Sequence, residues 1–205
     1  MLAPKVLITA GPTHEPIDPV RYIANRSSGK MAYALAAVAK DLGYRVVLIS
    51  GPVSLEAPLG VCLICVNTAL EMFDAVQKHI HDCAIFIGAA AVADYRVQNY
   101  QDKKIAKQDA LFELTLVQNP DIIAWVAQQE INTFVVGFAA QTEDVLSKAQ
   151  QKMQRKKLDM IIANDVSQAD IGFGSECNQV YIIKKDQSYE RSKISPKIDL
   201  ARDIW

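Results

Sequence analysis

A polar segment near the amino terminus carries residue types that bind anions. Positions 25–30 read Asn-Arg-Ser-Ser-Gly-Lys, and an apolar stretch typical of a helix follows directly. The hydroxyls of Ser27 and Ser28 and the backbone N–H groups from Gly29 onward would lie at the positive end of the helix dipole, where negative charge is stabilised. Simple capping of the helix by either serine is the alternative. The neighbouring cations lead us to favour an anion site.

The same segment fails two common nucleotide motifs. A phosphate loop needs glycine where Ala24 stands and serine or threonine where Met31 stands. A dinucleotide-binding turn needs three spaced glycines after the first strand and an acidic residue after the second, but the chain has only Gly11 and Ser50 at those places. A nicotinamide-dependent reductase is therefore disfavoured and is kept as a rival hypothesis.

Runs of small residues favour close approach of a planar ligand. Gly88, Ala89 and Ala90 follow a strand-like stretch, so that backbone N–H and C=O groups can read the edge of a base. Asp94 stands near them and can accept hydrogen bonds from a ribose or a base. Phe138 ends another strand-like run among small residues and suits contact with a base. Small residues also serve tight packing of a helix on a sheet, and at the first run the sequence leaves both interpretations open.

Three further groups have a functional and a structural interpretation. Lys104 belongs to the basic run 103–107 and is either a lid lysine that closes on phosphates or part of a solvated turn. Lys152 and Lys156 share one helix face, and their spacing alone favours a solvent-exposed stripe. Asn119 precedes a proline, which frees its side chain to cap the next helix.

The spacing of histidines and cysteines does not support metal or acyl-enzyme chemistry. His14, His79 and His81 do not cluster with carboxylates at metal-ligand spacings, and no serine, histidine and aspartate arrangement stands out. Cys62 and Cys65 have the spacing of a redox or zinc pair, but they lie in an apolar, strand-like run without a second pair. We therefore expect them to be buried thiols.

Strand-like and helix-like runs alternate along the chain. This alternation predicts an α/β fold: a doubly wound, mainly parallel, Rossmann-like sheet with helices on both faces. An insertion at about residues 97–118 is expected to form a lid, and residues 178–193 alternate like a hairpin before Pro196 opens a last short helix. The predicted strands are Lys5–Thr9, Arg45–Ser50, Val61–Val66, Ala84–Gly88, Thr133–Phe138 and Met160–Ala163, and the predicted helices are Lys30–Leu42, Ala69–His81, Asp121–Gln129 and Glu143–Lys157.

Length and composition limit the function classes. The chain has 205 residues, 50% of them hydrophobic, which suits a single domain spanning residues 1–205. A net charge of −1 gives no basic surface for nucleic acid. No run approaches the roughly twenty apolar residues of a membrane span, and the first residues lack the pattern of a signal peptide. We expect a cytoplasmic protein without membrane attachment.

Taken together, the motifs resemble bacterial phosphopantothenoylcysteine synthetase, in order along nearly the whole chain. In most bacteria this synthetase is the C-terminal half of a bifunctional protein whose N-terminal half is a flavin-dependent decarboxylase; nothing like that half, and so no flavin, is expected here. The chain departs from the family at Ala106, where many members have a further lysine. The segments that carry the resemblance are Asp18–Asn25, Ser27–Lys30, Ala90–Tyr95, Lys104–Lys107, Asn119–Ile122, Val136–Ala140 and Ala163–Val166.

The resemblance implies a ligase of coenzyme A biosynthesis that joins 4′-phosphopantothenate to cysteine through an acyl cytidylate, consuming CTP and releasing pyrophosphate and CMP. It also implies Mg²⁺ bridging the triphosphate with few or no protein ligands, and a homodimer with the site near the interface. A non-catalytic nucleotide-binding module is the second rival hypothesis. The implied catalytic residues are Asn25, Arg21 and Lys104, the implied CTP-binding residues are Gly88, Ala89, Ala90, Asp94, Lys104, Asn119, Pro120, Asp121, Ile122, Phe138, Lys152 and Lys156, and the candidates for the phosphate of the substrate are Ser27, Ser28 and Gly29.

Overall fold

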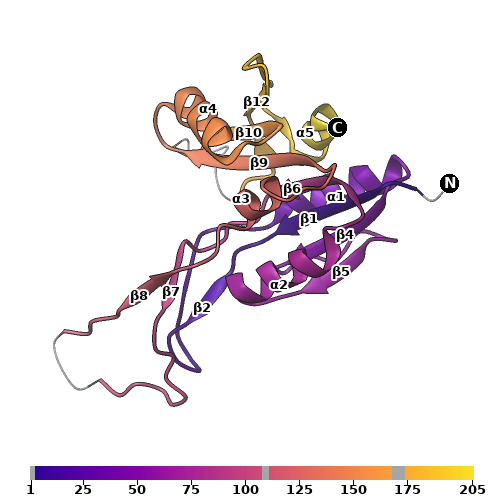
Figure 1. Ribbon diagram of the computed structural model, residues 1–205. Coiled ribbons are helices and arrows are strands. Elements are labelled where there is room, and N and C mark those ends of the chain that lie inside the picture. Colours follow the sequence, from indigo (N-terminus) through magenta and orange to yellow (C-terminus); the bar gives the residue numbers. More distant parts are fainter. Residues whose placement is uncertain (1–2, 108–110, 168–173) are drawn as a thin grey trace.

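An eight-stranded sheet forms the centre of the computed structural model, which describes residues 3–107, 111–167 and 174–205 (Figure 1). Two strands near the carboxyl terminus, β12 (Val180–Lys184) and β13 (Tyr189–Arg191), pair antiparallel and extend one edge of the sheet, which confirms the predicted hairpin. The other six neighbours run parallel: β10 (Met160–Asp165), β9 (Phe134–Gln141), β6 (Cys83–Gly88), β1 (Lys5–Ala10), β4 (Arg45–Ser50) and β5 (Cys62–Cys65).

Helices cover both faces of the sheet. On one face α1 (Lys30–Asp41) and α5 (Lys197–Ile204) bury apolar side chains against the strands. On the other face α2 (Ala69–His79), α3 (Ile122–Ala127) and α4 (Val145–Lys156) form a second apolar cluster. The doubly wound, mainly parallel fold predicted from the alternation is therefore confirmed. Within the described ranges, no helix combines the length and apolarity that a membrane span requires.

Carboxylates accept hydrogen bonds from backbone N–H groups at the start of α2. Thr68 and Glu71 form a capping box: the Thr68 hydroxyl accepts from the Glu71 backbone N–H, and the Glu71 side chain accepts from the Thr68 N–H. Glu15, only 1% exposed, also accepts a hydrogen bond from the Ala69 N–H at 2.9 Å. A segment that follows β1 in sequence is thereby fixed to this helix. The capping box agrees with the sequence pattern, whereas the contribution of Glu15 has no local signal.

Two narrow ribbons form an arm that projects from the body (Figure 1). One ribbon pairs β2 (His14–Pro16) with β3 (Tyr22–Ala24), and the other pairs β7 (Tyr95–Val97) with β8 (Leu116–Gln118). A further small sheet pairs β11 (Cys177–Asn178) with β14 (Ser195–Pro196). These six short strands were not predicted, because runs of two or three residues carry no readable periodicity.

The long connection after β1 crosses the carboxyl end of β4 at very short range. A Cβ atom added at Gly51 would lie 1.7 Å from the carbonyl oxygen of Pro12, so no larger residue fits there without a backbone shift. The Gly51 N–H also donates to the carbonyl of Ala10 at 3.0 Å. This crossing sets the course of the chain toward the arm and the site.

Two local predictions are wrong. Cys62 and Cys65 are exposed, because β5 is an edge strand whose outer side is not covered by a neighbouring strand. Asn119 does not cap α3; Asp121 does, and its carboxylate accepts from the Ala124 N–H at 3.2 Å. The Asn119 side chain is instead buried against the loop that follows β6.

Candidate active site

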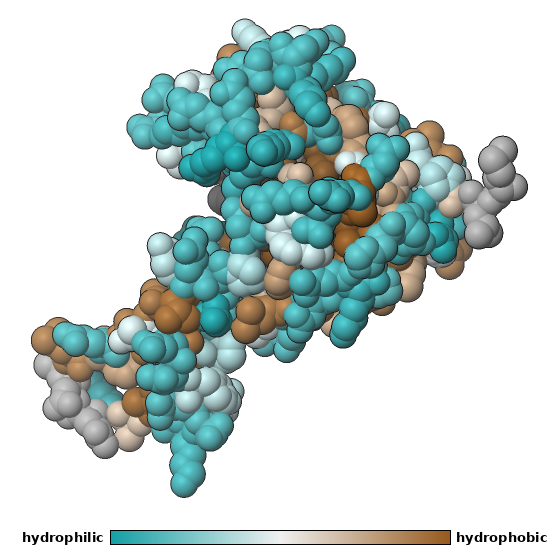
Figure 2. Space-filling model, in the orientation of Figure 1, coloured by the Kyte–Doolittle hydropathy of each residue, from teal (hydrophilic) through white to brown (hydrophobic). Residues whose placement is uncertain are grey.

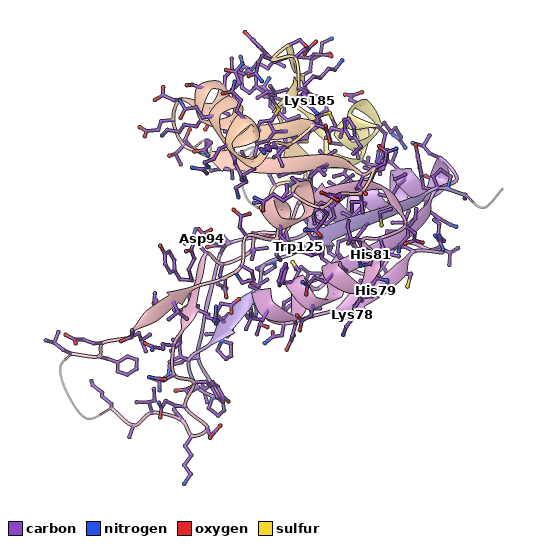
Figure 3. The ribbon with its side chains drawn as sticks, in the orientation of Figure 1. Lys78, His79, His81, Asp94, Trp125 and Lys185 are labelled. Atoms are coloured by element: carbon purple, nitrogen blue, oxygen red, sulfur yellow. The ribbon has the colours of Figure 1, made fainter. Side chains whose placement is uncertain are left out.

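A pocket of about 650 Å³ opens at the carboxyl ends of the parallel strands. It lies between the start of α1, the loop after β6 and the inner face of α4, and Figure 2 shows the surface hollowed between the α4 side of the body and the root of the arm. Asp94 marks that root in Figure 3. The predicted residues that line this pocket are Asn25, Ser27, Ser28, Gly29, Gly88, Ala89, Ala90, Asp94, Asn119, Pro120, Asp121, Ile122, Phe138, Lys152 and Lys156.

The loop after β6 is held by the connection that follows β1. The Ala91 N–H donates to the carbonyl of Gly11 at 2.8 Å, and the Ala93 N–H donates to the hydroxyl of Thr13 at 3.0 Å. Thr13 is fully buried. Because hydrogen bonds of buried groups are costly to break, the backbone of this loop is held in one conformation beside the pocket.

The small residues of this loop serve packing as well as access. A Cβ atom added at Gly88 would lie 3.0 Å from the Cδ1 atom of Ile123 in α3. Trp125, also in α3 and labelled in Figure 3, packs edge-on against the ring of Phe73 in α2 at a centroid distance of 5.2 Å, which joins the two helices. The packing interpretation of Gly88 is therefore correct, and the same glycine also lines the pocket.

Asn119 fixes the geometry where the arm meets the pocket. Its side-chain Nδ2 donates to the carbonyl of Ala93 at 2.9 Å, and its Oδ1 accepts from the Arg96 guanidinium at 3.2 Å. Its backbone N–H donates to the carbonyl of Asp94 at 2.8 Å. Asn119 therefore positions the loop that carries Asp94, whose own side chain is exposed at the rim.

Lys152 and Lys156 point from α4 into the pocket rather than forming a solvent-exposed stripe. Lys156 is paired with the Asp121 carboxylate at 2.7 Å. Lys152 donates from Nζ to the carbonyl of Phe138 at 2.8 Å. Burial, followed by the nearby charge of Lys156, lowers the pKa of Lys152 to about 8, although Asp121 and Asp94 act in the opposite direction. An incoming anion would favour the charged form of this lysine.

The amino-terminal end of α1 lacks a side-chain cap. Its cap residue is Gly29, with a φ of 75°, and no side chain accepts from the first turn there. The Ser27 hydroxyl accepts only a weak bond from the Gly29 N–H, at 3.3 Å. The capping alternative for Ser27 and Ser28 is therefore wrong, and the N–H groups of the first turn lie at the pocket wall.

Lysines that the sequence did not single out as ligand contacts complete the positive lining. Lys197, the first residue of α5, is 8% exposed, and its Nζ donates to the carbonyl of Ser175. Burial, then the charge of Lys30, lowers its pKa, while Glu176 and Cys177 act to raise it. Nothing local distinguishes Lys197 from other lysines, because only tertiary packing brings α5 to the pocket. Among the described residues, the cations Arg26, Lys30, Lys152, Lys156 and Lys197 line the pocket together with the carboxylates Asp94 and Asp121.

Asn25 lies at the pocket, but the other two implied catalytic residues do not. The Asn25 amide donates to the carbonyl of Val92 at 2.9 Å, which joins the two loops that flank the pocket. Arg21 and Lys104 do not line it. Strand β3 separates Arg21 from Asn25, and four extended residues span roughly 13 Å. Both residues belong to the arm.

Protein ligands for a metal are scarce at this site. Within the described part of the chain, no group of three or more His, Cys, Asp or Glu side chains is placed to hold an ion. His79 and His81 lie toward the end of α2, away from Asp94 (Figure 3). Asp94 and Asp121 are the carboxylates that line the pocket, and Asp121 already pairs with Lys156. The residues therefore fit an ion held mainly by ligand oxygens.

We predict that binding of tripolyphosphate to this pocket weakens about tenfold between about pH 7 and about pH 9, because Lys152 loses its charge as the pH rises through its pKa of about 8. Calorimetry in two buffers with different ionisation heats should also detect proton uptake on binding near pH 8.

Lys152→Arg is the matched control, since a guanidinium stays charged over this range and the ligand titrates identically in both proteins. The arginine variant should give a flatter profile. A parent profile as flat as that of the variant would contradict the assignment.

Comparison with known proteins agrees with the resemblance drawn from the motifs. The family model described as the DNA/pantothenate metabolism flavoprotein C-terminal domain matches residues 1–205. The chain is 53% identical over 178 residues to the coenzyme A biosynthesis bifunctional protein CoaBC of Vibrio vulnificus, covering 85% of this chain and 44% of that one. It is 44% identical over 200 residues to the CoaBC protein of Bacillus subtilis, covering 97% and 49%.

A solved structure supports the same assignment. The crystal structure of the C-terminal domain of a CoaBC protein matches with a TM-score of 0.85 and 36% identity, over 100% of this chain and 93% of that one. The chain spans about half the length of the curated relatives it matches. On both sequence and structure, the chain belongs to the DNA/pantothenate metabolism flavoprotein C-terminal domain family.

Proposed function

We propose that this chain is a phosphopantothenate–cysteine ligase of coenzyme A biosynthesis that uses CTP. The observation that carries the proposal is that one positively lined pocket gathers Asn25, the small-residue loop 88–90 and the Lys152 and Lys156 pair. Membership of the family supports it independently, because the relatives named above are coenzyme A biosynthesis proteins.

The nucleotide base would lie against the loop after β6. Backbone groups of residues 88–90 offer donors and acceptors at fixed positions, and Phe138 of β9 adds an aromatic surface. Fixed backbone groups discriminate well between bases, because a base with exchanged donors and acceptors leaves buried groups unpaired. Asp94 at the rim would accept from the ribose.

The triphosphate would lie toward α4. Lys152 and Lys156 supply positive charge there, and binding of phosphate would compete with Asp121 for Lys156. Mg²⁺ would be held chiefly by phosphate oxygens, with Asp94 as a pocket carboxylate that could also bind it, and when bound it would offset the charge of the leaving pyrophosphate. The open start of α1, with Ser27, Ser28 and Gly29, would take the phosphate of 4′-phosphopantothenate.

The chemistry would proceed in two balanced steps. A carboxylate oxygen of 4′-phosphopantothenate attacks the α-phosphorus of CTP, and the bond to the β-phosphate breaks as pyrophosphate leaves. The amine of cysteine then attacks the acyl carbon, the acyl–oxygen bond breaks, and CMP leaves while the nitrogen loses a proton. Asn25 would orient the acyl phosphate, since its amide has two N–H donors and the bond to Val92 uses one of them.

A homodimer would bring the remaining residues to the pocket. The arm carries exposed apolar side chains (Figure 2), among them Val20, Tyr22 and Phe112, which are 60%, 53% and 55% exposed. Several large apolar side chains exposed on one projecting segment favour contact with another protein surface. Because Arg21 and Lys104 are on this arm and not at the pocket of their own chain, we propose that they serve the pocket of a second copy.

We further propose that the protein works in the cytoplasm. Cys62 and Cys65 are free and exposed on β5, and exposed free thiols persist best in a reducing compartment. The relatives named above are coenzyme A biosynthesis proteins.

CTP should support formation of CMP that depends on both 4′-phosphopantothenate and cysteine. ATP and UTP should be much poorer, because each mismatched buried group costs about 1 to 3 kcal/mol. The measurement is release of pyrophosphate and of the matching nucleoside monophosphate with each of the four ribonucleoside triphosphates. NADPH serves as the comparison for the reductase hypothesis, and a larger thermal shift with NADPH than with CTP, or equal turnover with ATP, would refute the proposal.

Asn25→Asp should fold and bind CTP but form little product. The change places a carboxylate beside an anionic intermediate and replaces a donor to the Val92 carbonyl, so it disfavours the acyl cytidylate rather than the nucleotide. Product formation is measured beside the CTP-induced shift in melting temperature. Asn132→Asp adds the same charge at an exposed position outside the pocket and should retain activity.

A mixing experiment tests the dimer. Lys104→Gln should lower turnover more than it weakens CTP binding. When equal amounts of the Asn25→Asp and Lys104→Gln chains are allowed to exchange subunits, about a quarter of the parental activity should return, because half of the dimers are mixed and each has one intact site. If activity does not return although mixed dimers form, Lys104 serves the pocket of its own chain.

A further inference from the structure

The most fully satisfied carboxylate of the arm belongs to Asp18, which the proposed chemistry does not use. Its side chain is completely buried. Its Oδ1 accepts from the backbone N–H groups of Val20 and Arg21 at 2.8 and 2.9 Å. Its Oδ2 accepts from the Arg21 guanidinium, including a 2.9 Å bond from Nε. Burial alone would raise the pKa of Asp18, but these hydrogen bonds outweigh it and hold the pKa well below its usual range.

The same carboxylate reaches the segment that carries Lys104. The Ile105 N–H donates to Oδ2 of Asp18 at 3.1 Å, and the Ile105 carbonyl accepts from Nη2 of Arg21 at 2.8 Å. The N–H and the carbonyl of Ile105 are therefore both bound by the Asp18–Arg21 ion pair. Asp18 lies 87 residues and Arg21 lies 84 residues from Ile105 in the sequence. Lys104, the preceding residue, is exposed.

We propose that Asp18 is a positioning residue that fixes Arg21 and the Lys104 segment in one geometry, so that both reach a pocket together. We call the group of Asp18, Arg21 and Ile105 the Asp18 clasp. The role of Lys104 in the reaction rests on the proposed function; the clasp itself rests on the contacts given above. In this arrangement the insertion is not a freely moving lid at Ile105, because its backbone is tied there to the connection after β1.

The charge of Asp18 is essential to this arrangement. The hydrogen-bond partners of Asp18 given above are all N–H donors, so the site needs an acceptor on both oxygens. Asparagine has nearly the same shape, but its NH₂ group would face either the backbone donors or the guanidinium and Ile105 donors. Asp18→Asn should therefore release the clasp with little change in volume.

Hydrogen exchange tests the clasp directly. In Asp18→Asn, exchange of the Ile105 amide, followed by NMR, should rise at least about tenfold. The Gln101 amide donates to the carbonyl of Ile17 and is the internal reference, since that bond does not involve Asp18. Asp102→Asn, at an exposed position of the same segment, is the matched control and should leave the Ile105 exchange unchanged. Unchanged exchange in Asp18→Asn overturns the proposal.

Kinetics test whether the clasp acts through Lys104. Asp18→Asn should lower kcat at least about tenfold with little change in KM for CTP, because the nucleotide contacts lie elsewhere. Asp18→Asn should slow the Lys104→Gln variant by less than it slows the parent protein, because part of its effect acts through Lys104, whereas fully additive losses would overturn the proposal. Normal turnover of Lys104→Gln would instead refute the role of Lys104 in the proposed function, and the exchange measurement would still decide the clasp.

A second variant covers the case in which Asp18→Asn does not fold. Ile105→Pro removes the same N–H donor from a half-buried position of the arm and keeps the Asp18 and Arg21 side chains. It should lower kcat with little change in melting temperature. Full activity of a folded Ile105→Pro variant overturns the proposal.

Discussion

The direction of the two crossovers that leave β1 and β6 governs the site. These strands are neighbours and run parallel, yet the chain after β1 leads to α1 on one face of the sheet and the chain after β6 leads to α3 on the other. Their carboxyl ends therefore cannot be covered by the same helix, and a crevice must open between them. The pocket lies in this crevice, and its lining is completed by side chains from other elements, among them Phe138 of β9, Lys152 of α4 and Lys197 of α5.

A pocket formed by diverging chains needs connections between them. Backbone and side-chain hydrogen bonds of Gly11, Thr13 and Asn25 to the loop after β6 provide these connections, and the close crossing of Pro12 over Gly51 leaves the first connection no alternative course. Most of the donors or acceptors involved are backbone groups, which any sequence supplies. The rigidity of the pocket rim thus depends on a few polar side chains and on the absence of a side chain at Gly51.

Much of this architecture could be predicted from the sequence because its signals are local. Strand and helix periodicity, the Thr68 capping box and the polar segment 25–30 are all readable within a few residues. The long-range features are different: Lys197 reaches the pocket only because α5 packs beside α1, and Asp18 meets Ile105 only because two distant loops lie side by side in the arm. Cys62 shows the same limit, since an apolar run does not reveal whether its strand is an edge.

The contrast between the starts of α1 and α2 has a consequence for where an anion can be accepted. Both helix termini point positive ends outward, and both are intrinsically attractive to phosphate. Glu15 and Glu71 act as resident anions at α2, so a free phosphate arriving there meets like charge and no vacant N–H group at Ala69. At α1 the cap residue is Gly29, which has no side chain that could accept a hydrogen bond from the first turn. Of these two otherwise similar termini, the start of α2 is already occupied by carboxylates of the chain itself, whereas the start of α1 has no side-chain cap and its N–H groups stay available at the pocket wall.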